Sequence, residues 1–138
     1  MLLKFLLLTI LLGFTYSDRC LQCIAKQESG CRRVGCKMDR GSLSCGYYQI
    51  KLPYYQECGE PERLPQESSE DAWKRCSNRY HCAANCVENY FKKYKAWCPG
   101  KPDCEAKARL HNGGQNGCYS SATDGFWERV RQCVQSNY

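Results

Sequence analysis

Cysteine content is the feature that most constrains the fold of this chain. The 138 residues include 13 cysteines, which lie at irregular spacings from residue 20 onward. Disulfides persist in oxidising compartments, and they stabilise a small domain by constraining its unfolded state. The cysteines therefore predict a disulfide-rich extracellular domain. Because their number is odd, at least one thiol stays free or pairs with another molecule.

One cysteine pair has the spacing of a metal or redox site. Cys20 and Cys23 form a CxxC motif, which occurs in zinc knuckles and in thiol oxidoreductases. A second CxxC does not follow, and the other cysteines do not cluster. We therefore expect structural disulfides, with no metal and no cofactor.

The first 17 residues have the organisation of a secretory signal peptide. Lys4 is the positive n-region, residues 5–14 are an apolar h-region, and Thr15 and Ser17 form a small-residue cleavage site. About ten apolar residues are too few to span a bilayer, which takes roughly 20. We expect a signal peptide at 1–17, no membrane anchor, and one secreted domain at 18–138.

Periodicity and capping signals predict a mostly helical α+β domain with a short β-hairpin near its N-terminus. The alternation of residues 43–49 after the turn at 39–41 predicts a strand. The longest helical stripe runs to Trp97 and includes Tyr90. Helices are expected over residues 20–29, from 68 through 73, over 82–97, over 104–110, and from about 123 onward.

Glu28 is the first candidate catalytic residue. It continues a helical stripe that contains Leu21, Ile24 and Ala25, and Gly30 is the expected helix stop. The apolar face and the negative end of the helix dipole both disfavour an ionised carboxylate. We therefore expect Glu28 to hold its proton.

Asp39 is the second candidate, in a contrasting polar turn. Backbone amides, Arg40 and the hydroxyls of Ser42 and Ser44 lie within reach, and all of them favour an anion. A protonated acid facing a carboxylate is the arrangement that glycoside hydrolysis uses. The structural alternative is that Glu28 only ends a helix and Asp39 only shapes a turn.

The mature chain resembles the invertebrate-type lysozymes, a family that includes the leech destabilases. The likeness lies in the ordered motifs ESGC, MDRGSLSCGYYQIK and HNGG, in AWKRCSNRYHCAANCVENYFKKY, and in the final tryptophan helix. The resemblance implies a lysozyme-like fold that cleaves β-1,4 links between N-acetylmuramic acid and N-acetylglucosamine in bacterial peptidoglycan. It also implies that Glu28 is the proton donor and Asp39 the second catalytic carboxylate.

Sugar binding needs an open groove with aromatic faces, and residues 51–55 follow the hairpin where they would line one edge. Candidate contacts further along the chain also have a structural alternative to sugar binding. Tyr90 would fit the buried stripe of its helix equally well. His111 would fit a cation at a helix terminus, and the glycines after it would fit a helix cap. The resemblance implies saccharide contacts at Lys51, Pro53, Tyr54, Tyr55, Tyr90, His111, Asn112 and Gly113.

The chain departs from the family pattern at one cysteine. Family members read CxxCIC where this chain has Ala25, and the resemblance implies that the missing cysteine would close a short loop with Cys31. We therefore expect Cys31 to be free, the other 12 cysteines to form six disulfides, and Glu28 to be held less firmly, which affects rate. The expected state is a monomer, with dimerisation through the odd cysteine as an alternative.

The net charge of +6 suits an acidic cell-wall substrate. Lys and Arg are spread along the chain without a nucleic-acid-binding motif, so we expect no nucleic-acid partner. Two other functions remain open. The first is an isopeptidase like some relatives of the destabilase type, with Ser42 or Ser44 as nucleophile and Lys51 as base. The second is a non-catalytic cationic protein that binds peptidoglycan.

Overall fold

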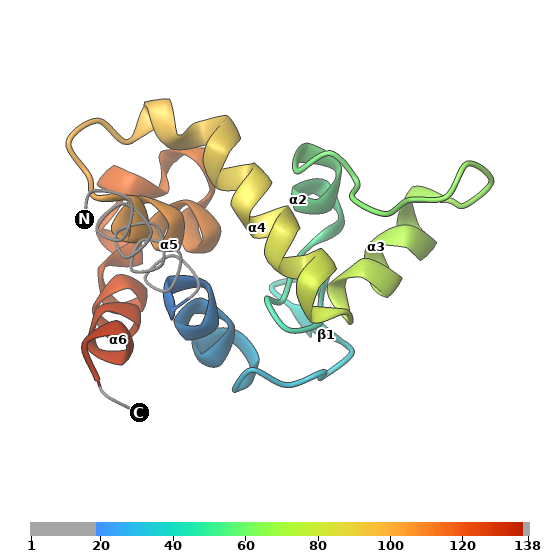
Figure 1. The fold of residues 1–138 in the computed structure, drawn as a ribbon, viewed down its shortest axis with the longest axis horizontal. Helices are drawn as coiled ribbons and strands as arrows, with labels where there is room; N and C mark the ends of the chain where they lie inside the picture. Colours follow the sequence, from blue (N-terminus) through green and yellow to red (C-terminus); the bar gives the residue numbers. More distant parts are fainter. Residues whose placement is uncertain (1–18, 137–138) are drawn as a thin grey trace, which may run out of the picture.

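The computed structural model describes residues 19–136, and most of them are helical. The first helix covers residues 19–29. It lies beside α5 and α6 on one side of the molecule, α2, α3 and the hairpin form the other side, and α4 runs between them (Figure 1). The remaining elements are β1 (Cys36–Asp39), β2 (Ser42–Cys45), α2 (Leu52–Glu57), α3 (Ser69–Ser77), α4 (Tyr80–Tyr94), α5 (Asp103–Gly113) and α6 (Asp124–Gln135), with short 3-10 helices η1 (Lys95–Trp97), η2 (Gly114–Tyr119) and η3 (Ser121–Thr123).

The signal peptide expected at 1–17 lies outside the described residues. None of the helices within residues 19–136 is long and apolar enough to cross a membrane.

Helix α4 carries the predicted buried stripe, which includes Ala83, Val87, Tyr90 and Tyr94. Trp97 does not continue it, because this side chain is 54% exposed. The α-helix ends at Tyr94 and the next residues form a 3-10 helix. The tighter turn changes the angle between successive side chains and rotates Trp97 away from the core.

The hairpin is shorter than predicted. β1 and β2 pair antiparallel with Asp39 opposite Ser42, but β2 ends at Cys45 instead of continuing to residue 49. Gly46 has a φ of 76°, and a Cβ there would lie 1.7 Å from the Ser77 carbonyl oxygen. Only glycine permits this close approach to the end of α3, so the chain turns here instead of extending.

Two helices differ from the prediction near the cleft. α5 extends to Gly113, one turn beyond the predicted end at residue 110, and it stops at Gly114, whose φ is 74°. This places His111 and Asn112 on the helix. α2 was not predicted as a helix, although Pro53 in its first turn is a known starting signal.

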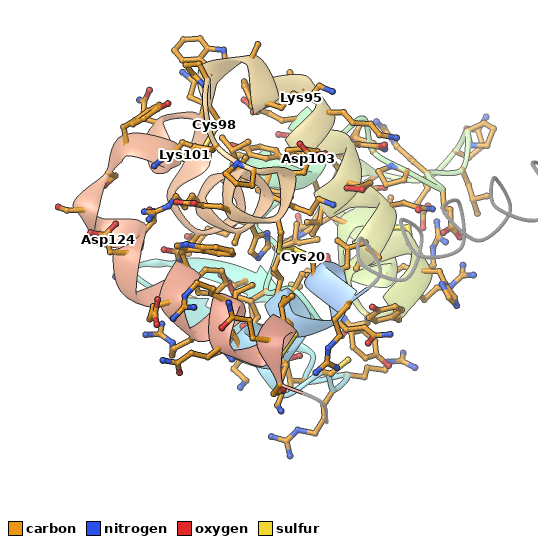
Figure 2. All side chains as sticks on the ribbon, turned by 60° about the vertical axis from the view of Figure 1, so that its left-hand side comes forward. Cys20, Lys95, Cys98, Lys101, Asp103 and Asp124 are labelled. Atoms are coloured by element: carbon orange, nitrogen blue, oxygen red, sulfur yellow. A yellow bond between two sulfur atoms is a disulfide. The ribbon has the colours of Figure 1, made fainter. Side chains whose placement is uncertain are left out.

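Six disulfides form and Cys31 is the free cysteine, as expected. The first helix is tied to both helices beside it, and Figure 2 shows Cys20 on this helix next to α5. Two bonds tie α2 and α3 to α4, one lies within the hairpin, and one links the segments that follow η1 and α5. The pairs are Cys20–Cys104, Cys23–Cys133, Cys36–Cys45, Cys58–Cys86, Cys76–Cys82 and Cys98–Cys118.

Candidate active site

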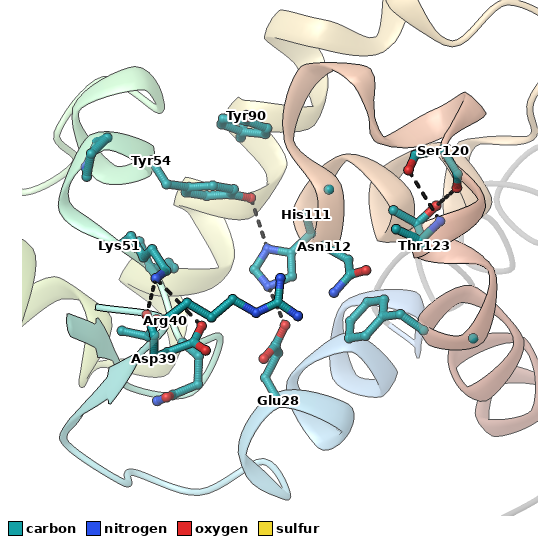
Figure 3. A pocket seen from close by; sticks show the side chains of 18 of the residues that line it. Glu28, Asp39, Arg40, Lys51, Tyr54, Tyr90, His111, Asn112, Ser120 and Thr123 are labelled. Carbon is teal, nitrogen blue, oxygen red and sulfur yellow. Dashed lines mark hydrogen bonds and ion pairs between the residues drawn. The ribbon is translucent and has the colours of Figure 1, made fainter. Parts of the chain in front are cut away.

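A cleft of about 870 Å³ lies where the first helix, the hairpin, α2, α4, α5 and α6 meet. It brings together most of the residues that the sequence predicts for catalysis and sugar binding (Figure 3). The predicted residues that line it are Glu28, Asp39, Ser44, Lys51, Pro53, Tyr54, Tyr90, His111, Asn112 and Gly113.

Glu28 enters the cleft from the last turn of the first helix. Ile24, one turn earlier, is fully buried, and Phe126 of α6 also lines the cleft. The Glu28 side chain is 22% exposed, and its Oε1 lies 3.2 Å from His111 Nε2. Glu28 is therefore largely enclosed, but it has a polar neighbour that the sequence did not associate with it.

Asp39 enters the cleft from the tip of the hairpin and is much more open, at 55% exposed. Its Oδ2 lies 3.6 Å from Lys51 Nζ, which stabilises the carboxylate as an anion. The predicted hydroxyl partners do not contact this carboxylate. Ser42 Oγ donates instead to the backbone oxygen of Asp39, and Ser44 is buried.

His111 has both ring nitrogens engaged within the protein. Nδ1 lies 3.1 Å from the Tyr54 hydroxyl, and Nε2 lies 3.0 Å from the Tyr48 carbonyl oxygen as well as near Glu28. The side chain is 3% exposed. His111 is therefore not a solvent-facing cation at a helix end, and its main neighbours are protein groups.

Tyr54 and Tyr90 form one wall of the cleft. Their rings stack with centroids 4.0 Å apart and planes at 11°. Burial, with a smaller contribution from Tyr90, raises the pKa of Tyr54 well above its usual value. Burial and the nearby Glu57 raise the pKa of Tyr90 to about 12. Both residues are therefore neutral phenols at physiological pH, with apolar faces beside polar hydroxyls.

Tyr55 is the predicted sugar contact that the structure places elsewhere. It is fully buried, and its hydroxyl donates to the Pro61 carbonyl oxygen at 2.9 Å. Adjacent residues on a helix point about 100° apart, so α2 directs Tyr54 into the cleft and Tyr55 into the core.

Three further charged residues, which the sequence did not assign to sugar binding, also line the cleft. They are Arg40, Glu57 and Arg129. Glu57 accepts a hydrogen bond from the Tyr94 hydroxyl. Glu57 lies three residues after Tyr54 on α2, and residues at this spacing share one face of a helix. The helical periodicity of α2 therefore indicates that both side chains face the cleft. Arg40 comes from the hairpin tip, where its φ is 51°.

The segment after Glu28, where Ala25 leaves Cys31 unpaired, is closed by hydrogen bonds. Cys31 N–H donates to the Ala25 carbonyl oxygen at 3.2 Å. Ser29 Oγ donates to the Tyr47 carbonyl oxygen at 2.8 Å and accepts from the Arg32 N–H at 3.1 Å. These bonds fasten the helix end to the turn after the hairpin.

Known proteins are similar to this chain along most of its length. The family model described as Destabilase matches residues 17–133. Invertebrate-type lysozyme 2 of Caenorhabditis elegans is 54% identical over 130 residues, which cover 93% of each chain. The chain belongs to the invertebrate-type lysozyme family.

Other members of the invertebrate-type lysozyme family agree in sequence and in fold. The lysozyme of Meretrix lusoria is 49% identical over 120 residues, covering 87% of this chain and 92% of that protein. The crystal structure of Tapes japonica lysozyme superposes with a TM-score of 0.71 at 47% identity, covering 83% of this chain and 87% of that one. The predicted α+β lysozyme-like fold is confirmed.

Proposed function

We propose that this chain is a lysozyme that hydrolyses β-1,4 links between N-acetylmuramic acid and N-acetylglucosamine in bacterial peptidoglycan. Family membership supports glycoside hydrolysis. The observation that carries the assignment of its residues is the pair of carboxylates in one cleft, with an enclosed Glu28 and an open Asp39 beside Lys51. Glycoside hydrolysis uses such a pair, one carboxyl group as the proton donor and the other as the nucleophile or stabilising anion.

Glu28 acts as the general acid. Its proton moves to the glycosidic oxygen while the bond from that oxygen to the sugar C1 breaks, and the bonding electron pair stays with the oxygen. Its position at the end of a helix fixed by two disulfides, Cys20–Cys104 and Cys23–Cys133, limits the movement of the backbone that carries it.

Asp39 supplies the negative charge that meets the developing sugar cation at C1, as nucleophile or as stabilising anion. Lys51 orients this carboxylate, since its Nζ donates to the Asp39 backbone oxygen at 2.7 Å and lies 3.6 Å from Oδ2. The greater exposure of Asp39 leaves the carboxylate accessible from the cleft.

The saccharide binds along the stacked tyrosines. Aromatic faces and a few polar groups are the usual lining of a sugar groove. Tyr54 and Pro53 line this wall, and Asn112 is exposed beside Gly113. The cationic cleft residues Lys51, Arg40 and Arg129 suit acidic groups of the cell wall.

Clearing of a peptidoglycan suspension by purified protein tests this function. Glu28→Gln and Asp39→Asn each lower the rate by about 10² to 10⁴-fold, because each removes positioned catalysis while keeping side-chain size. Glu128→Gln is the matched control, since Glu128 pairs with Arg131 on the surface of α6 outside the cleft. Full activity of either cleft variant would refute the assignment.

The disulfides and the apolar leader at residues 1–17 support secretion of the enzyme into an extracellular space, as a monomer that acts in antibacterial defence or digestion. Peptidoglycan is the proposed partner. The free thiol of Cys31 is exposed, so disulfide-linked dimers remain the alternative state.

A second activity, isopeptide hydrolysis, is favoured by one contact. Lys51 Nζ lies 2.5 Å from Ser42 Oγ, the spacing of a nucleophile and its base. However, Lys51 Nζ also contacts the backbone oxygen and the carboxylate of Asp39. Lys51 Nζ thus donates two hydrogen bonds and forms one ion pair, which are the contacts of an ammonium group, and an ammonium group cannot act as a base.

We therefore expect the glycosidase to dominate and glutamyl-lysine isopeptide cleavage to be weak or absent. Efficient cleavage that is lost in Ser42→Ala or Lys51→Met, but kept in Glu28→Gln, would establish the second activity.

A further inference from the structure

His111 lies between the cleft wall and the proposed general acid. It is on the last turn of α5, and Figure 3 shows its ring between the Tyr54 hydroxyl and the Glu28 carboxylate. The side chain is 3% exposed, so its contacts are with the protein. These contacts determine where its proton sits.

The Tyr48 carbonyl oxygen can only accept a hydrogen bond, and it lies 3.0 Å from Nε2. Nε2 therefore carries a hydrogen, and Glu28 Oε1 lies 3.2 Å from the same nitrogen. On the other side of the ring, the Tyr54 hydroxyl lies 3.1 Å from Nδ1. Burial raises the pKa of Tyr54 well above its usual value, so this residue is a neutral phenol that can donate to an Nδ1 without a hydrogen. The contacts on both sides fit a neutral ring with its proton on Nε2.

The groups that pack around the ring keep this arrangement in place. Tyr90 of α4 stacks on Tyr54 from behind, and Phe126 of α6 lies with its centroid 6.3 Å from the His111 ring. Arg40 of the hairpin tip extends across the cleft toward Glu28 (Figure 3). The charged residues that line the cleft around His111 are Glu28, Asp39, Arg40, Lys51, Glu57 and Arg129.

We propose that His111 is a positioning residue for the proton donor, whose Nε2–H fixes Oε1 of Glu28 and leaves Oε2 to carry the proton toward the glycosidic oxygen. This role rests on the proposed lysozyme function. The reacting proton moves from Oε2 to the glycosidic oxygen, while His111 keeps its own proton throughout.

The same hydrogen bond assists the reaction itself. As the proton leaves Oε2, negative charge develops on the carboxylate of Glu28. A hydrogen bond to an ionised carboxylate is stronger than one to a neutral acid, so the bond from His111 strengthens in the transition state. An interaction that is stronger in the transition state than in the ground state raises kcat.

His111→Leu removes the donor at nearly constant size. We expect kcat to fall by about 100-fold, because a misplacement of about 1 Å has an effect of that size, while KM changes little. The alkaline limb of the kcat profile moves to higher pH, because the carboxylate of Glu28 has lost a hydrogen-bond donor. A purely structural role would not move this limb.

His111→Gln keeps an N–H near the position of Nε2, and it restores much of kcat and the position of the alkaline limb. The control is His81→Gln, because His81 is the other histidine of the chain and is exposed outside the cleft. A change in KM alone for His111→Leu would overturn the proposal and make His111 a direct saccharide contact.

Nitrogen NMR of the wild-type protein tests the proton placement without any substrate, and it applies even where His111→Leu fails to fold. The two histidines give two sets of ring nitrogens, and exposed His81 supplies the reference. We expect Nε2 of His111 to carry a hydrogen and Nδ1 to carry none. A proton on Nδ1 instead would overturn the proposal, whereas failure of the wild-type enzyme to clear peptidoglycan would overturn only the proposed function.

Discussion

Ala25 is fully buried in the first helix, one turn before Glu28. Its carbonyl oxygen accepts a hydrogen bond from the Cys31 N–H. The backbone of the loop that contains Glu28 is therefore already closed at this point. A disulfide here would add a covalent link to a loop that hydrogen bonds hold in place.

Ala25→Cys should form a disulfide with Cys31 and raise the free energy of unfolding by up to about 2 kcal/mol, less than a long-loop bridge because the closed loop is short. Thermal unfolding measures the gain, and alkylation without reduction shows that the thiol of Cys31 has disappeared. Ala25→Ser is the control, because it adds a similar atom without a bridge. Two alkylated thiols in Ala25→Cys would show that the bridge does not form.

At the residue scale, the sequence predicts the catalytic pair better than it predicts the neighbours of that pair. Glu28 and Asp39 are identified by local environment together with family motifs, and both line the cleft. Tyr54 and Tyr55 are indistinguishable in sequence, because only the helix that carries them gives them different directions. The contact between Glu28 and His111 joins residues 83 positions apart in sequence, so local patterns do not indicate it.

At the element scale, Arg75 of α3 fastens the connection from α2 to α3. Its guanidinium donates to both carboxylate oxygens of Glu67, at 3.0 and 2.5 Å, and to the Glu62 carbonyl oxygen at 2.7 Å. The hydrogen bonds from Arg75 lower the pKa of Glu67 below its usual value of 4.5. A bidentate contact between a guanidinium and a carboxylate also fixes the geometry of the connection.

This ion pair predicts a pH dependence of stability. Since the folded-state pKa of Glu67 is lowered, its contribution is fully present above the unfolded-state pKa and is lost as the pH falls through the folded-state pKa. We expect the Tm of the wild type to fall as the pH drops below 4.5, and that of Glu67→Gln to fall less. Glu70→Gln is the control, because Glu70 pairs with Lys74 on the exposed face of the same helix. Equal acid sensitivity of Glu67→Gln and wild type would contradict the prediction.

The start of α3 has a strong local signal and follows the sequence prediction, whereas the end of β2 and the short helix α2 do not. Ser68 caps α3 by accepting from the Asp71 N–H at 3.1 Å, as the capping residues indicate. The end of β2 depends on the approach of Gly46 to Ser77, which is 31 positions away. α2 has six residues, too short for helical periodicity to distinguish it from a loop.

At the scale of the whole molecule, the disulfides fix the elements around the cleft. Within residues 19–136, no disulfide joins the first helix, which carries Glu28, to the hairpin, which carries Asp39. The first helix, which carries Glu28, is bonded to α5 and α6, and the hairpin, which carries Asp39, is closed within itself by Cys36–Cys45. The pairing joins residues up to 110 positions apart. Twelve paired cysteines allow many connectivities, so the family resemblance predicts six bonds and a free Cys31, whereas the sequence spacing does not give the partners.

The net charge is +6 for the full chain, and its excess of Lys and Arg over Asp and Glu persists without Lys4, so it predicts how salt affects the enzyme. Cationic surface attracts an anionic cell wall, and the Debye length falls from about 30 Å at 0.01 M to about 8 Å at 0.15 M ionic strength. We therefore expect clearing of peptidoglycan to slow across this range, while hydrolysis of a neutral N-acetylglucosamine oligomer changes little. If salt slowed the hydrolysis of both substrates equally, the effect would come from charges within the cleft, such as the ion pair of Lys51 and Asp39. The neutral oligomer thus separates the long-range field of the molecule from the local electrostatics of the catalytic site.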